Sequence, residues 1–394
     1  MFSKNIKTFT FLFSSSTKSA RCCERDFIRK MSLSPNKDER PKITPLKESR
    51  RFMIDCLKAV GAQQKHAEIV ADNLLEADHR GHYSHGMNRL ENYINDVEKG
   101  FSVANATPTI EKETTATAVV NANNGFGAVS GQFCMDLAIK KAEEAGIGIV
   151  TSHNANHYGI AGIYCLQALK KGLIGFSCTN TSPLMVPTRA KKAALGTNPI
   201  ALGVPGLQGD DFLLDFATTA VAVGKIEIQQ RKHQPIPEGW ALNENGRVET
   251  DSTKAFAASR LLPLGGVEKT SGYKGYGLGM LVEIFCGILS GSSYGPNIRS
   301  WTNPNAKANL GHCFMALDPK AFAEGVEERM SDLMNTIRNM EPVDPSLPVL
   351  VHGDAERNHM EKVQKLGGLS YVYNQHETNK RLAERLNVAP MQSI

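Results

Sequence analysis

The sequence predicts an α/β fold, and three observations lead to this prediction. Segments between residues 116 and 179 alternate in pattern between strand and helix, as βαβ units do. Apolar residues recur at helical spacing both before this region and after residue 326. The chain has 394 residues and is 41% hydrophobic, so it can bury a sizeable core and form more than one domain.

Three helices are expected before the strands begin. Their apolar stripes are Phe52, Cys56, Leu57 and Val60, then Ile69, Val70, Leu74 and Leu75, and finally Met87, Leu90, Ile94 and Val97. The third helix is expected to open near His85, directly before its apolar stripe.

The strand and helix patterns of the α/β region follow. In chain order they predict a strand at 116–121, a helix at 131–146, a strand at 147–152, a helix at 162–171 and a strand at 173–179. Further on they predict a strand at 212–214 and helices at 278–289, 326–340 and 377–386. The polar segments 206–211 and 229–251 are expected to be surface excursions, and we find no internal repeat.

The formal net charge of +5 lies entirely in residues 1–40, which hold nine Lys and Arg against four acidic residues. The rest of the chain is neutral, so a basic surface for nucleic acid is not supported. Residues 1–23 lack acids and mix basic residues with serines, as mitochondrial transit peptides do, although an ordinary disordered extension is the alternative. A start at Met31 would leave a shorter form, so the expected location is the mitochondrial matrix or the cytoplasm.

Composition also bears on membrane and redox classes. No apolar run approaches the roughly eighteen residues that a membrane span requires, so no membrane partner is expected. The eight cysteines are scattered and contain no C-x-x-C pair, which predicts buried thiols in a reducing compartment.

A hydroxyl, two imidazoles and a guanidinium lie within ten consecutive residues. Ser84, His85 and Arg89 could hold a carboxylate and move a proton beside it, because guanidinium groups pair with carboxylates and histidines transfer protons. Spacing alone also allows a structural interpretation, with Ser84 as a helix cap and the other two as surface residues. His79 and His82 could join His85 in a metal-dependent hydrolase, but no H-E-x-x-H is present, so no metal site is predicted.

Five motifs in order resemble the type-2 malate/L-lactate dehydrogenase family, over about residues 46–386. They are Ser84-His85-Gly86 with Arg89, Asn156-His157-Tyr158-Gly159, Gly196-Thr197-Asn198-Pro199, Asp215-Phe216-Ala217-Thr218 and Gly272-Tyr273-Lys274-Gly275-Tyr276-Gly277. The resemblance implies a fold without a Rossmann domain, in which helical N- and C-terminal segments pack around a central nucleotide-binding α/β domain. It also implies reduction of 2-oxo acids, or of related cyclic imino acids, with NAD or NADP, and a homodimer.

A glycine-rich turn between the first predicted strand and helix is a near miss to the dinucleotide-binding fingerprint. Gly125, Gly127 and Gly131 form G-x-G-x-x-x-G, with the third glycine one place late and no acid placed for a ribose. We expect these glycines to serve a tight turn and close helix–strand packing instead.

The resemblance suggests roles for the catalytic candidates. Arg89 suits the substrate carboxylate, because its planar fork can donate two parallel hydrogen bonds. His85, paired with Ser84, and His157 are both candidates for the proton donor, and the sequence does not choose between them. Thr197 is expected to hydrogen-bond the substrate, or alternatively to cap its own loop.

The cofactor candidates come from several segments. They are His157, Gly159, Thr181, Asp215, Phe216, Ala217, Lys274, Gly275, Gly353, Asp354 and Arg357. Asp215 could accept from ribose hydroxyls or cap a turn, and Lys274 could meet a phosphate in a glycine-rich loop. Two acids next to Arg357 make a 2′-phosphate site doubtful, which favours NAD over NADP.

The substrate is expected to be a malate- or lactate-like acid. In the imino-acid-reducing branch an aspartate follows the Asp-x-Ala-Thr segment, whereas this chain has Lys225, which argues against an imino acid. Ureidoglycolate and a binding protein without activity are further alternatives.

The resulting domain prediction has four parts. It places a targeting or disordered extension at 1–40, a helical region with the catalytic motif at 41–105, a nucleotide- and substrate-binding α/β region at 106–325, and a helical region packing on the N-terminal one at 326–394.

Overall fold

The computed structural model describes residues 41–300 and 306–394. The predicted N-terminal extension, residues 1–40, therefore lies outside the described residues. Among those described, no helix is long and apolar enough to cross a bilayer. Six cysteines fall in the described part of the chain, and all six are free and buried.

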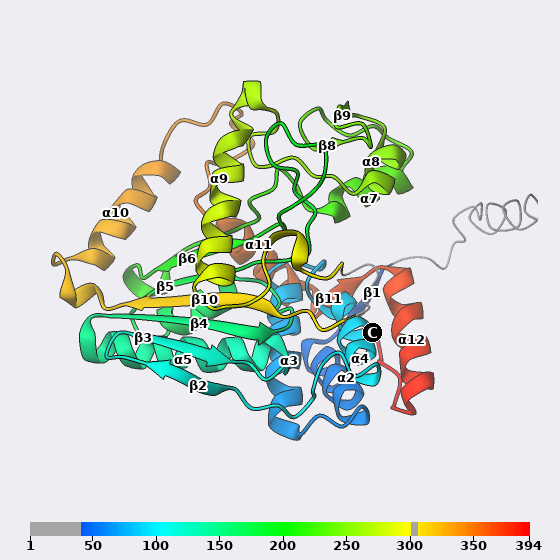
Figure 1. Ribbon diagram of the computed structural model, residues 1–394, viewed down its shortest axis with the longest axis horizontal. Coiled ribbons are helices and arrows are strands. Elements are labelled where there is room, and N and C mark those ends of the chain that lie inside the picture. The colour runs from blue at the N-terminus through cyan, green and yellow to red at the C-terminus, as the bar shows by residue number, and fades with distance from the viewer. Residues whose placement is uncertain (1–40, 301–305) are drawn as a thin grey trace, which may run out of the picture.

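A seven-stranded mixed sheet forms the centre of the molecule, in the order β2-β3-β4-β10-β5-β6-β7 (Figure 1). Its strands are β2 (Thr109–Glu113), β3 (Thr117–Asn121), β4 (Ile147–Ala155), β5 (Ile174–Thr179), β6 (Ile200–Val204), β7 (Phe212–Phe216) and β10 (Leu310–Leu317). Strands β3 and β4 pair in parallel, and the other neighbouring pairs are antiparallel. The predicted α/β class is confirmed.

The two faces of the sheet are covered by different helices. On one face, α5 (Gly127–Ala145) and α6 (Gly162–Leu169) bury a core with the middle strands. On the other, α9 (Gly272–Glu283) and the π-helical turn η4 (Ile284–Ile288) pack on β5 and β10. Figure 1 shows α9 above the sheet and α5 below it.

Strand β10 was missed by the sequence analysis. It lies between β4 and β5 and runs antiparallel to both, so these two strands of the predicted βαβ alternation are not neighbours. Most of its residues are buried on both faces, and no polar–apolar alternation therefore marks it in the sequence.

The two ends of the described chain share one core. It contains residues of α2 (Leu46–Ala59), α3 (Gln64–His79) and α4 (Leu90–Glu98), together with residues of α11 (Asp354–Leu366), β11 (Leu369–Tyr371) and α12 (Tyr373–Leu386). Strand β1 (Lys42–Thr44) pairs antiparallel with β11 and joins the ends directly. Helix α10 (Val326–Arg338) is not part of this layer, because it packs on the turn η2 (Leu207–Gly209).

A small lobe stands above the sheet and corrects the expected surface excursion at 229–251. It contains α7 (Val223–Arg231), the hairpin β8 (Ala241–Leu242) with β9 (Val248–Glu249), and α8 (Ser252–Ala258). Ile236 and Ala241 lie inside the predicted loop but belong to the core of this lobe, so the segment is structured.

Candidate functional site

The turn between α3 and α4 carries three of the catalytic candidates, and its structure corrects one prediction. Helix α4 begins only at Leu90, after the 3-10 turn η1 (Met87–Arg89), so His85 lies in the turn and not in a helix. Gly86 has φ of −99° and ψ of −131°, outside the helical region, and the Met87 N–H that follows it donates to the Asp78 Oδ2 atom of α3 at 2.9 Å.

Two histidines from distant parts of the chain meet at this turn. The rings of His85 and His157 are nearly parallel, with centroids 5.7 Å apart. Each ring has a hydroxyl at Nδ1: Ser84 Oγ lies 2.8 Å from that of His85, and Tyr93 Oη lies 2.7 Å from that of His157. The Gly159 N–H also donates to His157 Nδ1 at 3.3 Å. Because that nitrogen accepts, neutral His157 carries its proton on Nε2.

Burial and a nearby cation keep both imidazoles neutral. Burial lowers the pKa of His85 to about 3, and the charge of Arg89 contributes to this shift. The pKa of His157 also lies well below its ordinary value, first because of burial and then because a second positive charge beside His85 and Arg89 is unfavourable. Arg89 is oriented across the turn, where its Nε donates to the Ser84 carbonyl oxygen at 2.7 Å.

Close packing holds the loop that contains His157. A Cβ atom on Gly127, at the start of α5, would lie 2.3 Å from the carbonyl oxygens of Asn156 and His157. Gly159 has φ of +85°, and a Cβ there would lie 1.9 Å from Asn73 Oδ1 of α3. The near-miss glycine motif therefore serves close packing, as predicted.

Thr181 and Thr197 lie side by side. Thr181 follows the end of β5, and Thr197 precedes β6. The Thr197 N–H donates to Thr181 Oγ1 at 2.9 Å, and the two hydroxyl oxygens are 3.3 Å apart. Asn198 Oδ1 accepts from the Thr181 N–H, and Asn198 Nδ2 donates to the buried carboxylate of Glu283 at 2.9 Å. Two neighbouring hydroxyls are thus fixed by a buried polar cluster.

Asp215 lies within β7, whereas the sequence predicted a strand that ends before it, at residue 214. Its Oδ2 accepts from the Gly162 N–H at 2.7 Å and so caps α6, and burial raises its pKa to about 6. The charges of His82 and Glu356 act on this pKa, and these two side chains are 3.5 Å apart. Phe216 and Ala217 follow directly and are partly exposed. The catalytic turn, β7 and α11 therefore converge here.

The glycine-rich segment with Lys274 is the first turn of α9 and not a loop. A Cβ on Gly275 would lie 2.3 Å from the Leu264 carbonyl oxygen, so this glycine is required for packing within the chain. Lys274 itself is exposed.

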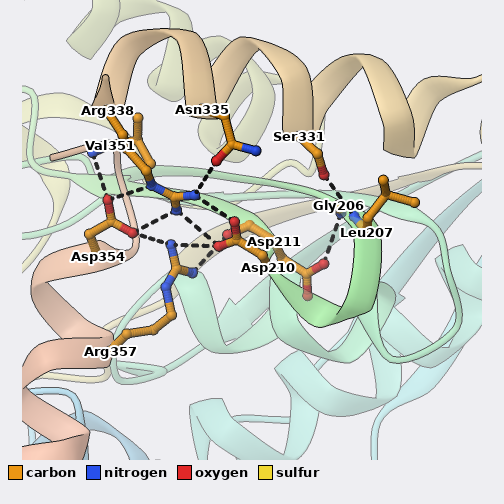
Figure 2. Close-up of polar contacts among 10 residues, drawn as sticks. All are labelled: Gly206, Leu207, Asp210, Asp211, Ser331, Asn335, Arg338, Val351, Asp354 and Arg357. Atoms are coloured by element: carbon orange, nitrogen blue, oxygen red, sulfur yellow. Dashed lines mark hydrogen bonds and ion pairs between the residues drawn. The ribbon is translucent and has the colours of Figure 1, made fainter. Parts of the chain in front are cut away.

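The last cofactor candidates lie at the start of α11, in the ion-pair cluster of Figure 2. Gly353 is the left-handed N-cap, with φ of +104°. The Asp354 carboxylate bridges Arg357 at 2.5 Å and Arg338 of α10 at 2.7 Å, while Asp210 pairs with both guanidinium groups. Both arginines are therefore already paired with carboxylates.

Sequence reasoning missed Tyr93 and Asp78. Tyr93 stands four residues after Arg89, so helical spacing could have placed it on the same face. No spacing pointed to Asp78, because its contact with Met87 arises from the turn between two helices.

The site is suited to proton transfer beside a bound anion. The turn and the facing loop join a partly buried guanidinium and two neutral imidazoles, each with a hydroxyl at its Nδ1, and no group of three metal-ligating side chains occurs among the described residues. Such a site suits an enzyme that acts on small carboxylic acids.

Comparison with known proteins identifies the family. The model of the malate/L-lactate dehydrogenase family matches residues 44–377, and the chain belongs to this family. A malate dehydrogenase of Pyrococcus abyssi is 41% identical over 347 residues, which cover 87% of this chain and 95% of that protein. An L-sulfolactate dehydrogenase of Methanocaldococcus jannaschii is 37% identical, over 83% and 93%.

Solved structures agree. The malate dehydrogenase of Pyrococcus horikoshii OT3 superposes with a TM-score of 0.82 at 36% identity, over 91% of this chain and 99% of that one. The malate dehydrogenase of Entamoeba histolytica superposes with a TM-score of 0.84 at 31% identity, over 89% of this chain and 99% of that one. The chain is thus a dehydrogenase that transfers a hydride between a nicotinamide cofactor and a 2-oxo or 2-hydroxy acid.

Proposed function

We propose that this enzyme interconverts oxaloacetate and malate, with NAD as the preferred cofactor. The observation that carries the proposal is the pair of neutral imidazoles, His85 and His157, next to Arg89. Relatives named malate dehydrogenase, at 41% and 39% identity, support malate over the other acids.

Each group has a chemical task in this proposal. Arg89 pairs with the substrate carboxylate, and the bound nicotinamide supplies the hydride to the carbonyl carbon. The anion offsets the charge of Arg89, which is one cause of the low histidine pKa values, so binding raises the pKa of both imidazoles.

His157 is the proposed proton donor. Its Nδ1 is engaged by Tyr93 and Gly159, so Nε2 is the nitrogen that faces the carbonyl oxygen. The donor is the imidazolium form, which the bound anion favours, and the ring returns to neutral imidazole when Nε2 gives its proton to that oxygen. In the imidazolium the Nδ1–H donates to the Tyr93 hydroxyl oxygen, and this hydrogen bond remains after Nε2 has given up its proton. His85 is held by Ser84, and its ring stacks on the His157 ring and so orients it.

Several of the cofactor candidates have the chemistry that a nicotinamide dinucleotide requires. Thr181 and Thr197 offer hydroxyls for an amide, Asp215 a carboxylate for ribose hydroxyls, and Lys274 an exposed cation for phosphate. A 2′-phosphate would need a free cation, whereas Arg357 is paired with Asp354 and Asp210 (Figure 2). This pairing supports NAD over NADP.

A substrate panel tests the proposal. Oxaloacetate, pyruvate, sulfopyruvate and a cyclic imino acid are each offered with NADH and with NADPH while nicotinamide absorbance is followed. We expect the highest kcat/KM for oxaloacetate with NADH. A preference for the imino acid would overturn the proposal. We do not expect this preference, because the exposed Lys225 stands where the imino-acid-reducing branch has an aspartate.

We also propose that the enzyme is a homodimer. Helix α9 and turn η4 expose a continuous apolar stripe, in which Met280, Ile284 and Ile288 are 40%, 49% and 56% exposed. These residues are four apart and so share one helix face. An exposed stripe of this kind is typical of a subunit interface, and a second copy of the chain is the occupant that the family resemblance implies.

A further inference from the structure

A buried carboxylate lies behind the catalytic turn. Asp78 is 0% exposed, and its Oδ2 accepts hydrogen bonds from the Met87 N–H at 2.9 Å and from the Tyr371 hydroxyl at 2.7 Å. Tyr371 belongs to β11, almost three hundred residues further along the chain, and is 2% exposed. One carboxylate oxygen thus connects the turn to the C-terminal part of the fold.

The turn lies directly against this carboxylate. A Cβ atom on Gly86 would stand 1.9 Å from Asp78 Oδ1, so only glycine allows the backbone to approach this closely. Oδ1 has no hydrogen-bond partner, and among the described residues no cation is among the groups that act on Asp78. A buried carboxylate without a cation is costly, and packing alone would be served better by an apolar side chain.

The residues on either side of the contact are site residues. His85 lies two positions before Met87, and Arg89 lies two positions after it. The contact with Asp78 therefore fixes the position of the backbone between the His85 imidazole and the Arg89 guanidinium. A shift of about 1 Å in such a turn is enough to lower catalysis by roughly a hundredfold.

We propose that Asp78 and Tyr371 are positioning residues of the reaction, acting together to hold the His85–Arg89 turn against the His157 ring. The proposal rests on the proposed function, because the turn matters for catalysis only if the site performs the reduction. It assigns no contact with substrate or cofactor to either residue.

The test compares Tyr371→Phe, which removes only the hydroxyl, with Asp78→Asn and with the packing control Leu382→Val. Leu382 lies in the same core and is 2% exposed. We expect Tyr371→Phe to lower kcat by about tenfold with the Kd for NADH changed by less than about twofold. Leu382→Val should lower the melting temperature and keep kcat. If Asp78→Asn does not fold, the kcat of Tyr371→Phe still tests the positioning role.

A second readout does not depend on activity. Histidine side-chain nuclear magnetic resonance of the same proteins reports the environment of the His85 ring. Tyr371→Phe should move the His85 signals, whereas those of His233, an exposed residue after α7, should stay in place. Unmoved His85 signals, or an unchanged kcat, would overturn the positioning role. If the wild type reduces no 2-oxo acid, the proposed function fails while the His85 signals still test the contact.

Discussion

At the residue scale, the charge of Arg89 acts strongly on the neighbouring histidines because the site is partly buried. Arg89 lies partly buried beside two imidazoles, and its charge lowers the pKa of both. Desolvation strengthens such interactions because little water is present to screen them. The same residue can therefore bind an anion and control when the histidines accept a proton.

Arg89→Lys tests the carboxylate anchor. A lysine keeps the charge but cannot reproduce the planar fork with its two parallel hydrogen bonds. We expect kcat/KM for the oxo acid to fall about thirty- to a thousandfold, which corresponds to roughly 2–4 kcal/mol. The Kd for NADH should change little, and near-normal kcat/KM would place the anchor elsewhere.

Asp78→Asn tests the buried carboxyl through the pH dependence of stability. Burial raises the pKa of Asp78 from 3.8 to about 7 in the folded protein. Between these values the folded state holds a proton that the unfolded state has lost, so this group lowers the free energy of unfolding as pH rises. The full effect, on the order of 4 kcal/mol, is reached above pH 7.

Urea unfolding at several pH values measures this effect. The free energy of unfolding of Asp78→Asn relative to wild type should increase from pH 4 to pH 8, on top of a constant cost for the new buried amide. A difference that does not change with pH would show that Asp78 titrates near its ordinary pKa.

At the element scale, the start of α5 positions the His157 loop. Gly127→Ala places a Cβ 2.3 Å from two backbone oxygens of that loop, which must then move. We expect kcat to fall by about tenfold or more, because the imidazole shifts with its backbone. The matched control is Gly224→Ala in α7, which has no atom within 4 Å of its new Cβ.

The control should behave in the opposite direction. Alanine is the better helix former, so Gly224→Ala should keep kcat and stabilise the protein by up to about 1 kcal/mol. Equal effects of the two substitutions on kcat would mean that the contact with the His157 loop does not matter.

At the scale of the whole molecule, the α9–η4 stripe is the test of assembly. Ile284→Glu places a charge in the middle of the stripe, and burying it against a second copy would be strongly unfavourable. Light scattering at micromolar concentration should show a dimer for wild type and a monomer for the variant. Phe322→Glu is the control, because Phe322 is 59% exposed and lies outside the stripe. A wild-type monomer would remove the dimer proposal.

The sequence by itself determined the local elements and the identity of the site motifs. Periodicity predicted α2, α3, α5 and α12 because each has one apolar face and its backbone hydrogen bonds are local in the chain. The motifs around Ser84, His157 and Thr197 identified the family because their residues are contiguous. Their roles at the site remain predictions.

Only the tertiary structure decided how these parts meet. It inserted β10 between β4 and β5, packed α11 on the N-terminal helices and connected the turn before α4 to α3 through Met87 and Asp78. It also paired Tyr93 with His157 and Tyr371 with Asp78. The physical reason is that these contacts join residues far apart in the chain. Their energies depend on burial and distance, which exist only once the chain has folded.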